Sequence, residues 1–245
     1  MGSNPAIVPT PVEDVQGDGR WLSMHQHFVS QAHDLEPDVV LVGDSMLANL
    51  QITELWENWF APLHSMNLSV GGDQTQHVLW RLHNGELECI QPKVIVVMVG
   101  TNNHSHSAEQ VAEGIMEVCK LLNEKQPQAD IVLLALLPRG EKENPIREKH
   151  RKINEILGEE SKKIERIQMV DLGRDLLQAD GTISHRDMFD YLHLTHRGYR
   201  RVFQPLHDLL TQMLHGDDSH LVNEIAAATH STLPSPSDPA SVAAE

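Results

Sequence analysis

The sequence predicts an α/β fold, a three-layer sandwich in which a five-stranded parallel sheet lies between two layers of helices. The first observation is a set of short apolar runs at residues 39–42, 66–70, 94–99, 131–137 and 167–170. Strands of a parallel sheet are covered on both faces, so they are expected to be apolar throughout rather than at alternate positions. The second observation is helical spacing of apolar residues between the runs, and this alternation is typical of a doubly wound sheet.

Six segments carry the helical spacing, one of them before the first apolar run and one after the last. They are residues 21–33, 47–59, 75–82, 108–122, 146–164 and 198–214. Short, right-handed connections between parallel strands place such helices on both faces of the sheet.

The 245 residues are enough for one domain of this type and too few for two of ordinary size. Residues 1–19, rich in proline, glycine and acidic side chains, are expected to form an arm that runs along the surface. The domain itself is predicted to span residues 20–215. Residues 216–245, rich in alanine, serine, proline and histidine, are predicted to form a disordered tail.

Composition narrows the classes of function. The net charge of -16 argues against a nucleic-acid or anionic-membrane partner, since both require concentrated positive charge. No apolar run approaches the roughly 18 residues of a membrane-spanning helix, so no integral membrane association is expected. The two cysteines show no disulfide framework, and the N-terminal segment lacks a secretion pattern, which favours a cytoplasmic location. The 16 histidines are scattered without the pairing of a zinc site, so no metal or other cofactor is expected.

A serine follows the first apolar run closely, in the sequence Gly43-Asp44-Ser45. Open α/β sheets gather their chemistry at the carboxyl ends of the strands, and Ser45 is expected at a strand-to-helix junction there. A serine hydroxyl is a weak nucleophile unless a histidine takes its proton and a carboxylate orients that histidine. Asp190 and His193 supply both groups, although an Asp-x-x-His string alone is common on the solvated faces of helices. Together these residues indicate a serine esterase.

Candidate donors for the oxyanion of a tetrahedral intermediate follow the next two strands. Gly72 ends the glycine pair after the second run, and Asn102 follows the third. Taken singly, each is typical of an ordinary turn or helix cap. Because all these elements follow the ends of successive strands, one pocket is expected to collect them, with the Ser45 N–H as a third donor. Leu47 stands where an α/β-hydrolase elbow requires its second glycine, which excludes that class.

These motifs resemble the four sequence blocks of the SGNH, or GDSL, hydrolases. The blocks are Gly43-Asp44-Ser45, the glycine pair 71–72, Gly100-Thr101-Asn102 and Asp190-x-x-His193. Further stretches, at residues 36–39, 77–82, 84–88, 92–97, 137–142 and 187–190, resemble the catalytic α subunits of type I intracellular platelet-activating-factor acetylhydrolase. The resemblance covers roughly residues 10–215 and implies the flavodoxin-like fold of SGNH hydrolases.

The resemblance implies a role for each motif residue. Ser45 would be the nucleophile, His193 the general base and then acid, and Asp190 the carboxylate that orients it. The oxyanion hole would consist of the Ser45 amide, Gly72 and Asn102.

The same resemblance implies a substrate, and with it an acyl pocket. The family removes the sn-2 acetyl group of platelet-activating factor, 1-O-alkyl-2-acetyl-glycerophosphocholine, through an acetyl-enzyme, releasing the lyso-lipid and acetate. The small acyl pocket would be lined by Met46, Thr101 and Leu192. Because the methionine side chain adapts its shape, we expect Met46 to loosen the selectivity for acyl length.

The resemblance also implies partners: a second catalytic subunit, identical or paralogous, and a β-propeller regulatory subunit of the lissencephaly type. Two alternatives remain open at this point. The chain would act on other short-chain acyl esters, since many specificities share the SGNH blocks. Alternatively, its main task would be to bind the β-propeller partner.

Overall fold

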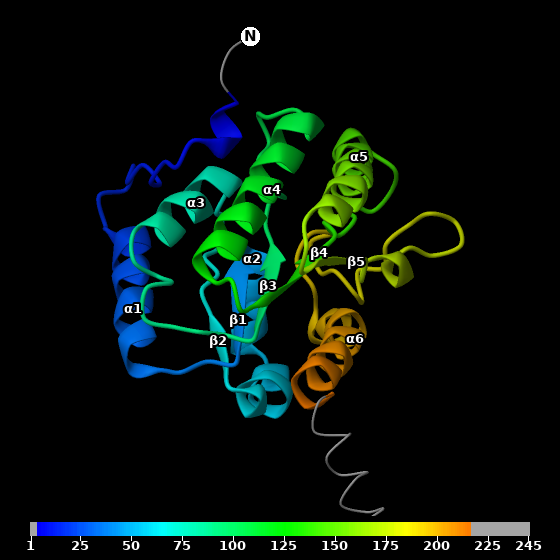
Figure 1. The fold of residues 1–245 in the computed structure, drawn as a ribbon. Helices are drawn as coiled ribbons and strands as arrows, with labels where there is room; N and C mark the ends of the chain where they lie inside the picture. The colour runs from blue at the N-terminus through cyan, green and yellow to red at the C-terminus, as the bar shows by residue number, and fades with distance from the viewer. Residues whose placement is uncertain (1–3, 217–245) are drawn as a thin grey trace, which may run out of the picture.

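The structure, a computed structural model, describes residues 4–216 and shows a five-stranded parallel sheet (Figure 1). The order of the strands across the sheet is β2-β1-β3-β4-β5. Their bounds are Val39–Gly43 for β1, Ser65–Asn67 for β2, Val94–Met98 for β3, Asp130–Leu134 for β4 and Ile167–Val170 for β5. The tail predicted for residues 216–245 lies outside the described residues, apart from Gly216.

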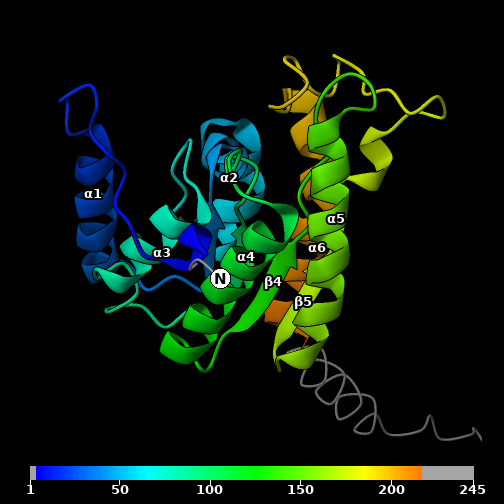
Figure 2. The ribbon, with the colours of Figure 1, turned by 90° about the horizontal axis from the view of Figure 1, so that it is seen from above.

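Helices cover both faces of the sheet, which confirms the predicted three-layer fold (Figures 1 and 2). One face carries α1 (Arg20–Asp34), α3 (Thr75–His83), α4 (Ala108–Lys125) and α5 (Pro145–Glu160). The other carries α2 (Ser45–Ala48) and α6 (His196–His215). Within β1, Val40 and Val42 pack into the first layer and Val39 and Leu41 into the second. This alternation explains why the strand is apolar throughout.

Two predicted strands end three residues before their apolar runs do. The run 66–70 gives a strand that ends at Asn67, although the N–H groups of Leu68 and Val70 still donate to carbonyls of β1. The run 131–137 gives a strand that ends at Leu134. Two residues later, the Leu136 N–H donates to Asn154 on α5 instead of to a neighbouring strand. A side-chain acceptor on α5 therefore takes over from the sheet just beyond the end of β4.

The single helix predicted for residues 47–59 is wrong. The chain there forms α2, then a 3-10 turn over Asn49–Ile52, and then a π-helical turn over Trp56–Phe60. Thr53 has an extended backbone, and its hydroxyl donates to the Leu50 carbonyl, which interrupts the helical bonding. Most apolar residues of the segment are still buried, among them Leu47, Leu50, Leu55 and Trp56, whereas Ile52 is exposed. The apolar spacing therefore predicted most of the burial correctly and the continuous helix incorrectly.

The N-terminal segment packs closely on the domain. Pro5–Ile7 forms a 3-10 turn whose Ala6 is fully buried. The Thr75 hydroxyl, at the start of α3, donates to the Ala6 carbonyl at 2.8 Å, and Asn4 donates to the Gln110 carbonyl on α4. This segment therefore contacts the first helical layer at two points.

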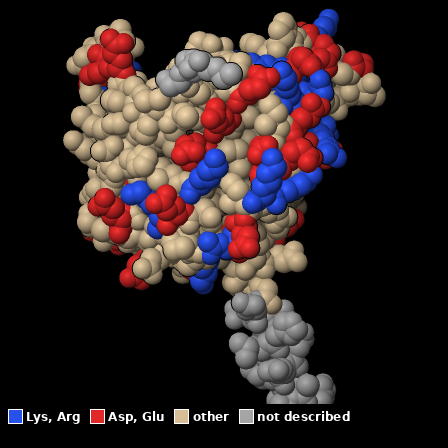
Figure 3. All heavy atoms as spheres, turned by 45° about the horizontal axis from the view of Figure 1, so that its top comes forward, with Lys and Arg blue, Asp and Glu red and all other residues tan. Residues whose placement is uncertain are grey.

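Charged side chains of both signs alternate on the surface near α5. Arg151 pairs with Glu148 and Glu155 along the helix, and Lys152 pairs with Glu109 of α4. Figure 3 shows Lys and Arg interspersed with Asp and Glu on that side of the face it displays. Such alternation does not create the continuous positive surface that nucleic acids bind.

Candidate active site

The turn between β1 and α2 presents Ser45 at the carboxyl end of the sheet. Gly43 ends the strand, and a Cβ added there would lie 2.2 Å from the Met98 carbonyl oxygen of β3, so only glycine allows this approach. Asp44 caps α2, with its Oδ1 accepting the Met46 N–H at 3.0 Å. Ser45 is the first helical residue, as the sequence predicted for a strand-to-helix junction.

Two further side chains hold this turn from outside. The Tyr199 hydroxyl of α6 donates to the Met46 carbonyl at 2.9 Å, and the Asn67 amide of β2 donates to the Leu47 carbonyl at 2.8 Å. Both side chains are buried. A short helix of four residues is marginal alone, so these bonds fix the direction in which Ser45 points.

Asp190 and His193 lie in a tight turn rather than on a helix. Asp190 Oδ1 accepts the backbone N–H groups of Leu192 at 3.0 Å and of His193 at 2.6 Å. Tyr191 adopts a left-handed backbone with φ of 58°, and its carbonyl accepts the Gly140 N–H. The aspartate therefore builds the turn that presents the histidine.

The turn brings the three predicted residues together. His193 Nδ1 lies 2.7 Å from Asp190 Oδ2, and His193 Nε2 lies 3.2 Å from the Ser45 hydroxyl oxygen. Partial burial raises the pKa of Asp190, but the His193 ring and the two backbone N–H groups outweigh it and hold that pKa below its usual value. A carboxylate on one ring nitrogen and a serine hydroxyl on the other is the arrangement that activates a serine.

The two predicted oxyanion loops also lie at this edge of the sheet. Gly72 has a left-handed backbone with φ of 87°, and a Cβ added to Gly71 would lie 3.8 Å from the Ser45 Cβ. Asn102 uses one amide N–H to bond to the Asp73 carbonyl at 3.0 Å. An amide nitrogen carries two hydrogens, so the second is available for another acceptor.

The three predicted acyl-pocket residues line one small cavity. Met46, Thr101 and Leu192 meet there, and the space between them is about 10 Å³, roughly that of a single water-sized sphere. The remaining lining residues are Asp44, Met98, Leu136, Leu137, Pro138 and Arg139. This wall is mostly apolar.

Two charged residues of this cavity were not singled out as site residues from the sequence. Asp44 is fully buried, its Oδ2 has no hydrogen-bond partner among the described residues, and burial raises its pKa to about 7. The Arg139 guanidinium donates to the Thr101 carbonyl at 3.3 Å. Burial lowers its pKa, against the opposing charges of Asp190 and Asp44. Asp44 follows β1 and Arg139 lies in the segment after β4. Their position after the carboxyl ends of strands is the feature of the sequence that could have identified them.

Two features are absent from residues 4–216. No helix there is long and apolar enough to cross a membrane. Within the same residues, no three His, Cys, Asp or Glu side chains are grouped to hold a metal ion.

Comparisons with known proteins identify the family of the chain. The model of the GDSL-like lipase/acylhydrolase family matches residues 41–201. The chain is 53% identical over 216 residues to platelet-activating factor acetylhydrolase IB subunit alpha1 of Rattus norvegicus, covering 88% of this chain and 93% of the relative. It is 53% identical over 212 residues to the alpha2 subunit of Homo sapiens, covering 86% and 93%.

Solved structures show the same fold at low sequence identity. A GDSL-like lipase from Bacteroides thetaiotaomicron matches with a TM-score of 0.65 and 15% identity, over 79% of this chain and 98% of that one. Est24, a carbohydrate acetylesterase from Sinorhizobium meliloti, matches with a TM-score of 0.56 and 13% identity, over 73% and 100%. With its family match and its 53% identical relatives, the chain belongs to the GDSL-like lipase/acylhydrolase family, beside the platelet-activating factor acetylhydrolase IB alpha subunits, and is a carboxylic ester hydrolase.

Proposed function

We propose that this protein is a serine esterase that removes the sn-2 acetyl group of platelet-activating factor and related acetylated phospholipids. The observation that carries the proposal is the chain of contacts from Asp190 through His193 to Ser45, next to a small and mostly apolar cavity. The names of the relatives at 53% identity support the choice of substrate. The chemistry follows from the geometry in two half-reactions.

In the first half-reaction, His193 Nε2 accepts the Ser45 proton while the Ser45 oxygen bonds to the acetyl carbonyl carbon. The carbonyl electrons move to its oxygen, which receives hydrogen bonds from the Ser45 and Gly72 N–H groups and from the second amide N–H of Asn102. The bond to the glycerol oxygen then breaks, and His193 returns the proton to that oxygen. The lyso-lipid leaves, and the acetyl group stays on Ser45.

In the second half-reaction, a water replaces the lipid oxygen. His193 takes a proton from this water, whose oxygen bonds to the acetyl carbon, and the same donors stabilise the oxyanion. The bond to Ser45 breaks, the serine regains its proton from His193, and acetic acid leaves and ionises to acetate in solution. Asp190 holds the ring in the tautomer that both steps need, with Nδ1 protonated.

The direct test is hydrolysis of platelet-activating factor by wild type and Ser45→Ala side by side, with sn-2 propionyl and butyryl analogues in the same assay. We expect activity that depends on Ser45 and falls as the acyl chain lengthens. Activity in Ser45→Ala equal to wild type would overturn the proposal.

The test also separates the two alternatives. The contacts around Ser45 recognise an acyl group and say little about the alcohol, and Est24 shows that one fold serves a different ester. Activity confined to small acetyl esters would keep the mechanism and change the substrate. Inactivity on every ester would favour a subunit that mainly binds its partner.

We also propose an assembly and a location. The relatives are named as subunits, which supports a dimer with an identical or paralogous catalytic chain and binding to a β-propeller regulatory subunit. Cys89 is exposed and unpaired, which fits the reducing cytoplasm. Light scattering after size-exclusion chromatography, with and without the β-propeller subunit, tests the assembly, and cell fractionation tests the location.

A further inference from the structure

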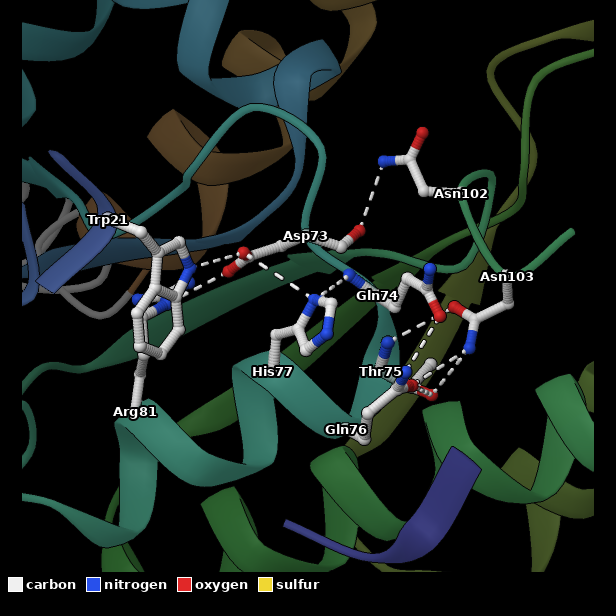
Figure 4. Close-up of polar contacts among 9 residues, drawn as sticks. All are labelled: Trp21, Asp73, Gln74, Thr75, Gln76, His77, Arg81, Asn102 and Asn103. Atoms are coloured by element: carbon white, nitrogen blue, oxygen red, sulfur yellow. Dashed lines mark hydrogen bonds and ion pairs between the residues drawn. The ribbon is translucent and has the colours of Figure 1, made fainter. Parts of the chain in front are cut away.

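A buried charged cluster lies directly behind the proposed oxyanion hole. Asp73, the residue after Gly72, is fully buried, and its carboxylate accepts two hydrogen bonds, with His77 Nδ1 a further 4.0 Å contact. Trp21 Nε1 of α1 donates to Oδ1 at 2.7 Å, and Arg81 Nε of α3 donates to Oδ2 at 2.9 Å (Figure 4). Gly72, whose N–H is proposed to bind the oxyanion, is therefore followed by a residue whose side chain is held in place by two hydrogen bonds.

The cluster continues inward from Arg81. This side chain is fully buried and also donates to Glu86 Oε2 at 2.5 Å, and Glu86 in turn contacts His25 Nδ1 at 2.8 Å. Burial raises the pKa of Asp73, and the Arg81 guanidinium beside it opposes that rise. A cation that is paired on two sides stays in one place, because moving it would leave buried charges unpaired.

The backbone of Asp73 makes the second connection. Its carbonyl accepts the Asn102 amide N–H at 3.0 Å. Asp73 is therefore next to Gly72 in the chain and hydrogen-bonded to Asn102, the two proposed oxyanion donors. Beside it, Asn103 Oδ1 accepts the Thr75 N–H at 3.1 Å, and Asn103 Nδ2 lies 3.1 Å from the Thr75 hydroxyl. Figure 4 shows these bonds joining the loop after β2 to the loop after β3.

We propose that Asp73 is a positioning residue: its side chain, fixed by Trp21 and Arg81, holds the Gly72 N–H and the Asn102 amide at the distances that the oxyanion requires. The inference rests on the proposed oxyanion roles of Gly72 and Asn102, and not on the choice of lipid. Donors misplaced by about 1 Å lose much of their effect, so a loosened Asp73 lowers the rate of the chemical step. Ground-state binding does not depend on these donors, so KM stays unchanged.

Trp21→Phe is the informative variant, because it removes the N–H to Asp73 and keeps an aromatic ring. Trp80→Phe is the matched control, since its ring packs 5.3 Å from that of Trp21 in the same layer. With 4-nitrophenyl acetate as the probe, we expect Trp21→Phe to lower kcat about tenfold with KM within about twofold. We expect Trp80→Phe to stay within about twofold of wild type in both constants.

A double-mutant cycle separates positioning from loss of structure. In the Asn102→Ala background one of the positioned donors is gone, so Trp21→Phe should lower kcat less than about threefold. Equal losses with and without Asn102, an unchanged kcat in Trp21→Phe, or an equal loss in Trp80→Phe would overturn the proposal.

The activity of Asn102→Ala and the folding of every variant are measured as well. If Asn102→Ala alone keeps full activity, the proposed oxyanion role itself fails, which distinguishes that failure from failure of the positioning role. Thermal unfolding and near-ultraviolet circular dichroism establish that each variant is folded. Should Trp21→Phe not fold, Asp73→Asn takes its place, with the same split between kcat and KM expected and the same results overturning the proposal.

Discussion

At the scale of single residues, the side chains of the proposed mechanism should differ in how much each contributes to kcat. Ser45→Ala removes the nucleophile, and we expect kcat to fall on the order of a million-fold. Asp190→Asn leaves the ring in the wrong tautomer and should cost about ten-thousand-fold, and Asn102→Ala about a hundred- to a thousand-fold. Steady-state kinetics on one acetyl ester gives all three values. Similar activity in the three variants would contradict the assignment.

A second residue-scale prediction concerns Leu192, which lines the acyl cavity. Leu192→Ala enlarges the cavity, so the preference for acetyl over butyryl esters should weaken by about tenfold, since a methylene is worth roughly 1–3 kcal/mol in an apolar pocket. The ratio of kcat/KM for the two esters measures the effect. Ile52→Ala, at a side chain that is 85% exposed, is the control and should leave the ratio unchanged. An unchanged ratio in Leu192→Ala would place the acyl group elsewhere.

The sequence could identify residues whose motif spacing carries the signal, and it missed those whose role depends on burial. Ser45, Asp190 and His193 stood out because a serine mechanism needs those three types. Asp44 belongs to the same motif, yet its full burial and unpaired oxygen follow from packing that no spacing reveals. Asp73 was missed for the same reason, because its partners Trp21 and Arg81 lie on two other elements.

At the scale of elements, the strands were predictable because burial on both faces makes them uniformly apolar. Their ends were not: just beyond β4, for example, the Leu136 N–H donates to Asn154 of the distant helix α5, which no local pattern reveals. The broken helix after Ser45 has a local cause in the backbone of Thr53, which apolar periodicity does not register. The order of the elements was therefore easier to predict than their bounds.

The contact between β1 and β3 gives an element-scale prediction. In Gly43→Ala the new methyl group would lie 2.2 Å from the Met98 carbonyl oxygen, and neither backbone has room to move in the centre of the sheet. We expect the free energy of unfolding to fall by about 3 kcal/mol. Gly71→Ala is the matched control, because its added Cβ would make an ordinary 3.8 Å contact, and it should cost less than about 1 kcal/mol. Equal values from urea unfolding would contradict the close approach of the two strands.

At the scale of the whole molecule, Asp44 links stability to pH. Burial raises its pKa in the folded protein to about 7, whereas the unfolded chain releases this proton near the ordinary value of 3.8. Between these values the folded state holds more protons than the unfolded state, so this group lowers stability as pH rises from about 4 to about 7. The full cost, reached above pH 7, is roughly 4 kcal/mol.

His150 acts in the opposite direction. Burial lowers its pKa to about 4, so the unfolded chain binds more protons between about pH 4 and 6.5, and the stability that His150 contributes is lost as pH falls through that range. The free energy of unfolding of the wild type therefore contains two contributions that change with pH in opposite directions. Comparing the wild type with a variant that lacks only the Asp44 carboxyl cancels the His150 contribution and isolates that of Asp44.

Asp44→Asn makes that difference measurable. An asparagine oxygen still accepts the Met46 N–H, and the side chain carries no charge at any pH. We expect the free energy of unfolding of the variant, relative to that of the wild type, to increase steadily from pH 4 to 7 and to stay constant above pH 7. Urea denaturation at steps of half a pH unit measures this difference. Asp130→Asn, at the exposed start of β4, is the control for replacing an aspartate outside the cavity. A difference between Asp44→Asn and wild type that stays constant from pH 4 to 7 would mean that the Asp44 carboxyl is ionised throughout the range, and that the cavity beside Ser45 holds a negative charge at neutral pH.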